Sequence, residues 1–578
     1  MRVDKTAIDL AEKPRPRHSR RGAVYPRKRA SQACHTCRFR RTKCDNVRPA
    51  CTACLKLGAE CVYGYTNPST FDPASLVILQ KINDLEKLIQ PRANELPATP
   101  STGVGQISLP ASQNDFSSLV DGPSTHWARY LINLDTVLQW PPFEDCDCSS
   151  RLVPISPIAD KNAYSDPKTL PLSVDIDLPT SEILLQSFFG NVHIFNPILE
   201  EEAIREHVKT LNGIGWDAMS CLLLLIYAHG SISTPFRKNM SGLSPPALDD
   251  SITFHQAESY FLAAQIRMGA LFYDGGVIAA QSFFIAGMYL MATLRPLDAR
   301  KMFVQALACC QALFNHEGAT SASSEGKWNQ EQNIYWTCFK SELELRLELN
   351  LPRMNDSEFS YPNFFPSPPD RLNTKDEVAW YFYLAEIALQ RLRNRVLRYI
   401  GDKHHNTEMQ NVISDFQEQM DALHSLPEPL AFNCGDSGKE QDDALRFILN
   451  GHFLDCQETV YWQFIVNIVH GSPYRESDQV YLRKGLKVCV DRIQQNRQGF
   501  FYRHHGTWLM LRSCTRSAFV LLAAVRYTDL KPFLPVGWKE AVLDVTRMLW
   551  FWKDESRDIY EMLTILTMYM ERWLSWDM

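Results

Sequence analysis

The spacing of apolar residues over the C-terminal two thirds of the chain follows the helical period of about 3.6 residues. The stretch "LPTSEILLQSFFG" (178–190) has Pro179 near its start and a Thr or Ser placed to cap a helix ahead of an apolar face. Further segments with helical spacing lie near residues 216–229, 254–271, 277–294, 297–314 and 332–349. Strands do not alternate with helices in this pattern, which therefore predicts an all-α body over residues 176–578.

The longest uncharged run, residues 277–294, is just long enough to span a bilayer. It contains Gln281, Ser282 and Gly287, and it lacks a belt of basic or aromatic residues on both flanks. The run therefore predicts a buried core helix and no membrane partner. The first residues of the chain contain no apolar segment of the kind found in secretory signals, which predicts a reducing compartment.

The chain before residue 176 has little regular pattern. Residues 1–30 predict a disordered basic tail, and residues 91–175, rich in Pro, Ser, Thr and Gly, predict a mostly disordered linker. Residues 65–90 predict a linker with a short helix whose apolar residues have heptad spacing: Phe71, Ile78, Ile82, Leu85 and Ile89. Because the seam covers only about two heptads, it fits either a short dimerisation coil or a helix packed on its own domain.

Charge is distributed unevenly along the chain. The whole protein has a net charge of −6, but residues 1–61 contain 16 Lys and Arg against 5 Asp and Glu. Residues 13–44 contain twelve basic residues and no acidic one. A basic N-terminal part on an acidic remainder is the pattern expected of a protein that binds nucleic acid at one end, and the basic run also suits nuclear import.

Six cysteines stand within 28 residues, in "CHTCRFRRTKCDNVRPACTACLKLGAEC". The spacing C-x2-C-x6-C occurs twice, with six residues between the two copies. In a reducing compartment so dense a set favours metal ligands over disulfides, and an all-sulfur set favours zinc. Two zinc ions need eight ligand positions, so two of the six thiolates must bridge; the duplication suggests Cys34 and Cys51. The predicted ligands are Cys34, Cys37, Cys44, Cys51, Cys54 and Cys61.

The two halves of this module differ in charge. Between Cys37 and Cys44 the chain reads "RFRRTK", a short predicted helix that presents several cations to DNA, whereas the second half has only Lys56 between its last two cysteines. We expect the first half to contact bases and the second half to support the frame. The candidate DNA-binding residues are Arg38, Arg40, Arg41, Lys43 and Lys56.

The segment from Cys34 to Cys61 resembles the fungal Zn2Cys6 binuclear-cluster transcription factors. The resemblance implies one zinc on Cys34, Cys37, Cys44 and Cys51 and another on Cys34, Cys51, Cys54 and Cys61. It also implies that the first helix enters the major groove of double-stranded DNA and reads CGG-type triplets, mainly through Arg40 and Arg41. The family usually has Lys at the position of Arg41, and the two side chains are not equivalent in guanine recognition. Arg38, Lys43 and Lys56 are better placed for phosphate.

Residues 178–366 resemble the middle homology regulatory domain of the same family. The phrases that carry the likeness include "LLQSFFGNVHIFNPIL" and "LRPLDARKMFVQALACCQALF". The resemblance implies a nuclear, sequence-specific regulator of RNA polymerase II genes, such as those of a metabolic or secondary-metabolite pathway. It also implies a weak homodimer and contacts with the transcription machinery or co-regulators. The implied domains are a Zn2Cys6 module at 31–64 and a regulatory domain at 176–578.

The alternative is an enzyme or scaffold protein with an appended zinc module. "NCGDSGK" around Ser437 is similar to the nucleophile loop of trypsin-like proteases, but that fold is all-β and this loop lies between predicted helices. Phosphate-binding loops and zinc protease motifs are lacking, so we expect no enzyme. The paired histidines, 404–405 and 504–505, are expected at the surface, whereas Cys309 and Cys310 are expected in the core.

Overall fold

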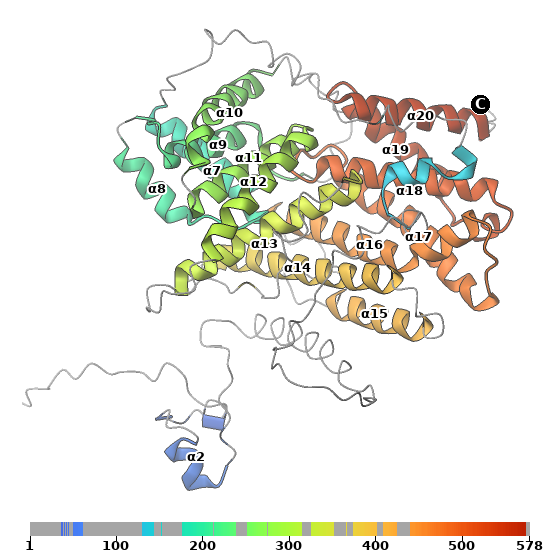
Figure 1. The fold of residues 1–578 in the computed structure, drawn as a ribbon, viewed down its shortest axis with the longest axis horizontal. Helices are drawn as coiled ribbons and strands as arrows, with labels where there is room; N and C mark the ends of the chain where they lie inside the picture. The colour runs from blue at the N-terminus through green and yellow to red at the C-terminus, as the bar shows by residue number, and fades with distance from the viewer. Residues whose placement is uncertain are drawn as a thin grey trace, which may run out of the picture. The chain divides into compact units, whose positions relative to one another are not determined.

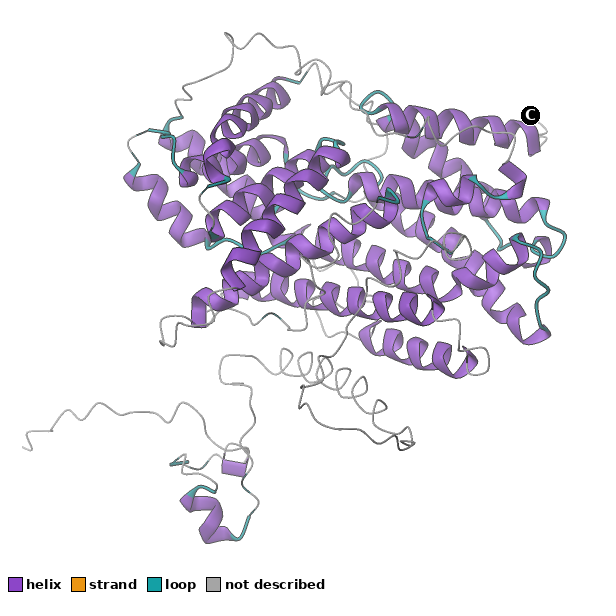
Figure 2. Ribbon diagram, in the orientation of Figure 1, coloured by secondary structure: helices purple, strands orange, loops and turns teal. Residues whose placement is uncertain are grey.

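The computed structural model describes two separate units of the chain, Met1–Asp72 and Pro73–Met578. The described residues are 36–37, 40, 42, 44–45, 50–59, 61, 130–143, 152, 176–211, 213–237, 251–273, 276–314, 325–351, 366, 374–401, 409–424 and 440–573. Every regular element in this part of the chain is a helix (Figure 2), which confirms the predicted all-α body. The expected basic tail at 1–30, the heptad segment at 65–90, His404, His405 and Ser437 lie outside the described residues.

The helical body in the second unit has two groups of helices joined by long ones (Figure 1). The first group is α7 (Leu178–Asn191), α8 (Glu201–Thr210), α9 (Ala218–Ile232), α10 (Ile252–Leu271), α11 (Val277–Ala292) and α12 (Pro296–Phe314). The long helices are α13 (Glu325–Glu348), α14 (Thr374–Gly401) and α16 (Glu440–Val469), with α15 (Met409–His424) against α16. The second group is α17 (Gln479–Asn496), α18 (Thr507–Arg526), α19 (Trp538–Trp552) and α20 (Arg557–Trp573).

The helices predicted from apolar spacing are present as α7 and as α9 to α13. The prediction missed α8, and the cap of α7 differs from the expected Thr or Ser. Asp177 precedes this helix, and its Oδ1 accepts a hydrogen bond from the backbone N–H of Thr180 at 3.2 Å. The cap therefore lies before Pro179, because proline fits the first turn of a helix, where a backbone N–H is not needed.

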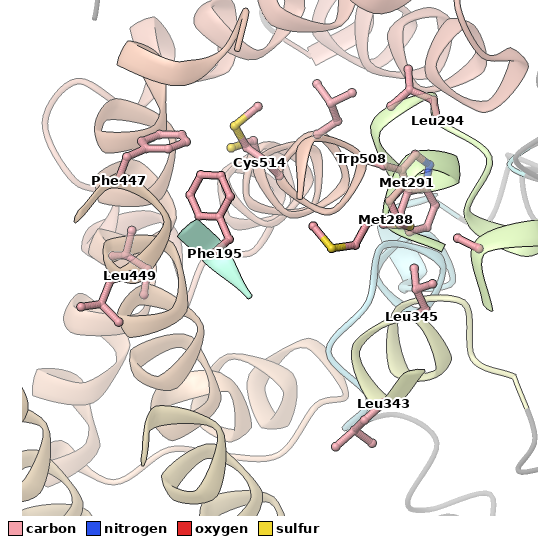
Figure 3. Packing of buried hydrophobic residues seen from close by; sticks show 14 of the residues in the cluster. Phe195, Met288, Met291, Leu294, Leu343, Leu345, Phe447, Leu449, Trp508 and Cys514 are labelled. Carbon is pink, nitrogen blue, oxygen red and sulfur yellow. The ribbon is translucent and has the colours of Figure 1, made fainter. Parts of the chain in front are cut away.

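The uncharged run predicted as a core helix is α11, in which every residue from Ala279 to Ala292 is buried. Its neighbours α9 and α12 pack against it, and Figure 3 shows side chains of α11, α13, α16 and α18 in one continuous core. Among the described residues α18 alone is long and apolar enough to cross a membrane by length and composition. Of its most apolar window, 89% is buried within the body, as expected of a core helix.

Residues 130–143 lie within the range predicted to be mostly linker, yet they are ordered against the helical body. They form α5 (Leu134–Leu138) and the short 3-10 helix η2 (Pro141–Phe143). The Trp140 ring lies 5.6 Å from that of Trp462 in α16, and the Phe143 ring lies 5.0 Å from that of Tyr569 in α20. For this segment the linker prediction was wrong, because its apolar residues pack on helices more than 300 positions later.

Buried charges connect this segment to the body. The guanidinium of Arg512 contacts both Asp135 of α5 and Glu348 of α13, each at 2.8 Å. Arg516, one turn further along α18, contacts Glu348 at 3.0 Å and Glu458 of α16 at 2.7 Å. Such a network satisfies charges that would be very costly to bury alone, and it fixes the relative positions of the helices that contribute to it.

The histidine pair 504–505 was expected at the surface, and this was wrong. His504 is 7% exposed, stacks on Tyr502 with ring centroids 5.1 Å apart, and has Phe447 beside it. His505 is half-buried. Cys310 is fully buried, as expected of a core residue, and Cys309 beside it is half-buried.

Candidate zinc centre and nucleic-acid interface

The second half of the cysteine module is built around α2 (Thr52–Leu57). Cys51 caps this helix, since its Sγ accepts a hydrogen bond from the backbone N–H of Cys54 at 3.4 Å. The carboxylate of Asp45 accepts a hydrogen bond from the backbone N–H of Thr52, at 3.1 Å from Oδ1. The helix ends at Gly58 with φ of +59°, in the left-handed region that favours glycine. The C-x2-C spacing thus places two thiols in the first turn of a helix.

The thiols converge across the two halves of the module. The Sγ of Cys37 lies 3.5 Å from the Sγ of Cys51 and 3.9 Å from that of Cys54. A zinc–sulfur bond of about 2.3 Å and a tetrahedral angle place two sulfurs of one zinc about 3.8 Å apart. These three thiols are almost wholly buried, and so is Cys44. The sulfur positions therefore fit a thiolate cage for zinc.

Cys51 has a central place in this cage. It belongs to two groups whose ligand atoms lie within 4.8 Å of one another, one with Cys37 and Cys54 and the other with Cys44 and Asp45. Its backbone N–H also donates to the Sγ of Cys61 at 3.2 Å. Hydrogen bonds from backbone N–H groups to sulfur favour the thiolate form that binds metal. All the cysteines among the described residues are free thiols.

Five of the six predicted zinc ligands are brought together in this way, and Cys34 lies outside the described residues. Asp45 was not predicted as a site residue, although its position directly after Cys44 and seven residues before Thr52 was visible in the sequence. It supports the module by fixing the start of α2. The chemistry of the set, buried thiols with N–H donors to sulfur, suits a structural metal rather than a catalytic one.

Two of the predicted DNA-binding residues are described, and both are exposed. Arg40 follows the turn that begins at Thr36, where its backbone N–H donates to the Thr36 carbonyl at 3.1 Å. Lys56 lies in the last turn of α2, near Gly58. Arg38, Arg41 and Lys43 lie outside the described residues.

Comparison with known proteins supports the same reading of both units. Residues 32–70 match the model of the fungal Zn(2)-Cys(6) binuclear cluster domain, and residues 185–394 match that of the fungal specific transcription factor domain. The second match begins within α7 and ends within α14, so α15 to α20 lie beyond it.

Several curated proteins are similar to this chain. The putative transcription factor ecdB of Aspergillus rugulosus is 24% identical over 467 residues, which cover 77% of this chain and 80% of the relative. The sorbicillinoid biosynthetic cluster transcription factor sor3 of Hypocrea jecorina is 23% identical over 362 residues, covering 54% of this chain and 52% of the relative. Transcription factor FBD3 of Fusarium pseudograminearum is 39% identical over 68 residues, covering 11% of this chain and 8% of the relative.

The two matched domains are those of a fungal Zn2Cys6 transcription factor. It combines a binuclear zinc-binding, DNA-binding domain with a large helical domain of the fungal-specific type. Its function is regulation of transcription through DNA binding. The matched families are families of transcription factors, which are generally not enzymes.

Proposed function

We propose that this protein is a nuclear regulator that binds CGG-like half-sites in double-stranded DNA through the first half of its zinc module. In this proposal Cys34 and Cys51 bridge the two zinc ions, and Arg40 and Arg41 contact guanine. The observation that carries the proposal is the position of Cys51, whose buried Sγ lies within 4.8 Å of the Sγ atoms of Cys37 and Cys54, two cysteines that this scheme assigns to different zinc ions.

We further propose that the remaining cations contact phosphate. Lys56 is exposed at the end of α2, where its ammonium group is free to approach the DNA backbone. Arg38 and Lys43 share this role in the proposal. Phosphate contacts set affinity and register, whereas guanine contacts set sequence preference.

The regulated genes are proposed to belong to a metabolic or secondary-metabolite pathway. The sor3 relative is named for a biosynthetic cluster, which supports this choice. The helical body is proposed to contact the transcription machinery or co-regulators, and the chain to act as a weak homodimer whose linker sets the half-site spacing.

The DNA-binding proposal is tested with point variants of the full zinc-loaded chain. Arg41→Ala should weaken binding to the cognate site by about 1–3 kcal/mol and relax the preference at one base pair. Lys56→Ala should weaken binding to all sequences alike and reduce the salt dependence of the affinity. Binding is measured by fluorescence anisotropy on the cognate site and on variants of it with single base-pair changes.

The control is Lys301→Ala, which removes an exposed lysine of α12 and should leave DNA binding unchanged. If Arg41→Ala and Lys56→Ala weakened all DNA sequences equally, the assignment of base reading to the first half would be wrong. Preference for a site without guanine triplets would overturn the CGG proposal.

A further inference from the structure

A pocket lies inside the helical body, between helices that the family match covers and helices beyond it. It contains about 940 Å³ of space not filled by protein atoms, including open solvent at its mouth. One wall comes from α13 and α14 and the other from α16, α17 and the start of α18. A ligand bound in this pocket would therefore contact both parts of the body at once.

One buried group in the pocket has a hydrogen that finds no acceptor. The Nδ1 of His504 accepts a hydrogen bond from the backbone N–H of Gly506 at 3.0 Å. Burial, and then the charge of His505, hold the pKa of His504 well below its usual value, so the ring is neutral and its proton sits on Nε2. This Nε2–H group is buried without a hydrogen-bond partner among the described residues. A buried donor of this kind calls for an acceptor from outside the chain.

Two further hydrogen-bond donors of the pocket are also buried without a partner. Arg492 is 2% exposed, and its two terminal nitrogens contact Asp455 at 2.6 Å and Glu458 at 2.8 Å. Its Nε has no partner, and neither has the Nε of Arg393. Within the described lining of the pocket, the buried side-chain atoms without a partner are all donors. A ligand rich in acceptor oxygens would satisfy such donors.

The charges of the lining favour an anion. The carboxylates of the lining are Glu344, Glu348, Glu386 and Asp455, and the cations are Lys340, Arg393, His452, Arg492 and Arg516. Burial by itself would lower the pKa of His452, but the hydrogen bond and charge of Glu386 raise it to about 9. Burial also raises the pKa of Glu344. Within the lining, the cations therefore exceed the carboxylates by one charge while His452 is protonated.

A metal ion suits this pocket less well. Ligand atoms of Glu344, Glu386 and His452 do lie within 4.8 Å of one another. However, the ammonium of Lys340 already contacts Glu386, and His452 donates to Glu386 at 3.1 Å, so this carboxylate is neutralised twice. A divalent cation would have to displace both cations.

Part of the lining is apolar and accommodates a carbon skeleton. The side chains that form this part are Ile132, Leu347, Phe447, Ile448, Leu509 and Met510. Pockets for small organic molecules commonly combine such an apolar wall with a few placed polar groups.

We propose that this pocket binds a small organic acid, with one carboxylate and further acceptor oxygens on an apolar skeleton. The inference that an acid binds follows from the pocket. The further inference that the bound acid regulates transcription rests on the proposed function. A ligand held by His504 and Arg393 joins the start of α18 to α14 and stabilises the contact between the two parts of the body.

The test uses Gly451, which lies on the face of α16 that lines the pocket, beside Ile448, His452 and Asp455. A Cβ atom at Gly451 would meet nothing within 4 Å, so Gly451→Phe fills pocket space without breaking an ion pair. Gly451→Ala is the small control. Gly269→Phe is the matched control elsewhere, because Gly269 of α10 has equally open surroundings and lies outside the lining.

Binding is measured by calorimetry and thermal shift on the full zinc-loaded chain. The probes are acetate, hexanoate, benzoate and salicylate, each paired with its neutral amide. We expect saturable binding of the larger carboxylates, strongest for salicylate, and no comparable binding of the amides. Gly451→Phe should weaken this binding at least tenfold, and Gly451→Ala, which adds a single methyl group, should weaken it far less. Gly269→Phe, outside the lining, should bind like the wild type. His504→Phe keeps an aromatic ring against Tyr502 but removes the donor, and it should weaken the carboxylates selectively.

The proposal is overturned if none of the carboxylates binds at millimolar concentration, if the amides bind equally well, or if Gly451→Phe binds like the wild type. Affinity for the cognate DNA is measured on the same preparations. If the chain binds the cognate DNA but none of the carboxylates, only this inference is overturned. If it binds the carboxylates but not the DNA, only the proposed function is overturned.

Discussion

Asp135 and Arg512 are separated by 377 residues in the chain, and their side chains form an ion pair at 2.8 Å. Arg512 is fully buried in α18, while Asp135 in α5 retains about a quarter of its side-chain exposure. Glu348 is the second partner of the same guanidinium. This arrangement attaches a short helix that precedes the family-matched region to a helix that follows it.

Removal of Arg512 should cost more stability than removal of Asp135. Arg512→Ala leaves Glu348 with Arg516 as its one remaining cation and creates a void beside Trp508, so we expect a loss of about 3–5 kcal/mol, as for other broken buried pairs. Asp135→Ala should cost less, because Arg512 keeps Glu348. The free energy of unfolding is measured in urea by circular dichroism. Lys301→Ala is the control, because it breaks an exposed ion pair with Asp298 and should cost little stability. A larger loss for Asp135→Ala would contradict the network described above.

Gly230 of α9 should tolerate no side chain. A Cβ atom there would lie 2.3 Å from the carbonyl oxygen of Leu184 in α7, and backbone cannot move aside as a flexible side chain can. Gly230→Ala should therefore lower the unfolding temperature clearly. Gly451→Ala in α16 meets open space, and it should instead stabilise by about 0.5–1 kcal/mol because alanine favours the helix. Equal effects of the two variants would refute this view of the α7–α9 contact.

The stabilising effect of His452 should depend on pH. Glu386, Glu344 and Asp455 face this histidine, with Lys340 beside Glu386, and the folded-state pKa is about 9 against an ordinary value of 6.5. Because the folded pKa is raised, the contribution is fully present below about pH 6.5 and is lost as the pH rises through about 9. The difference in unfolding free energy between the wild type and His452→Gln is measured at pH 6 and at pH 9.5. The difference should be larger at the lower pH; an unchanged or growing difference would show that His452 is not the titrating group.

Replacement of Cys51 should release both zinc ions. Its Sγ lies within 4.8 Å of the Sγ atoms of Cys37 and Cys54, which the proposed scheme assigns to different zinc ions, so Cys51→Ser removes a ligand from each metal if the thiolate is shared. Zinc content per chain is measured by elemental analysis, together with binding to the cognate DNA. Cys309→Ser is the control, since Cys309 lies on α12 in the other unit and should not affect the metal content. Retention of two zinc ions by Cys51→Ser would exclude the bridging role.

The sequence by itself determined the zinc module and the helical class of the body. Six thiols at a repeated spacing define a metal site locally, because ligands two or six residues apart need little else to converge. Helical spacing of apolar residues identified α9 to α13 for the same reason, since the period depends only on the helix itself. The cap at Asp177 was missed because Thr180 and Ser181, which follow Pro179, are also common capping residues. Only the backbone conformation shows that the helix begins after Asp177.

Only the tertiary structure decided which polar residues are buried. His504, Arg492 and Arg512 look like surface residues in the sequence, yet each is enclosed by helices far away in the chain. Residues 130–143 likewise carry a broken apolar pattern, and they become ordered because α16, α18 and α20 offer a surface that matches it. Burial is a property of all the elements around a side chain, and local periodicity contains no information on partners hundreds of residues away.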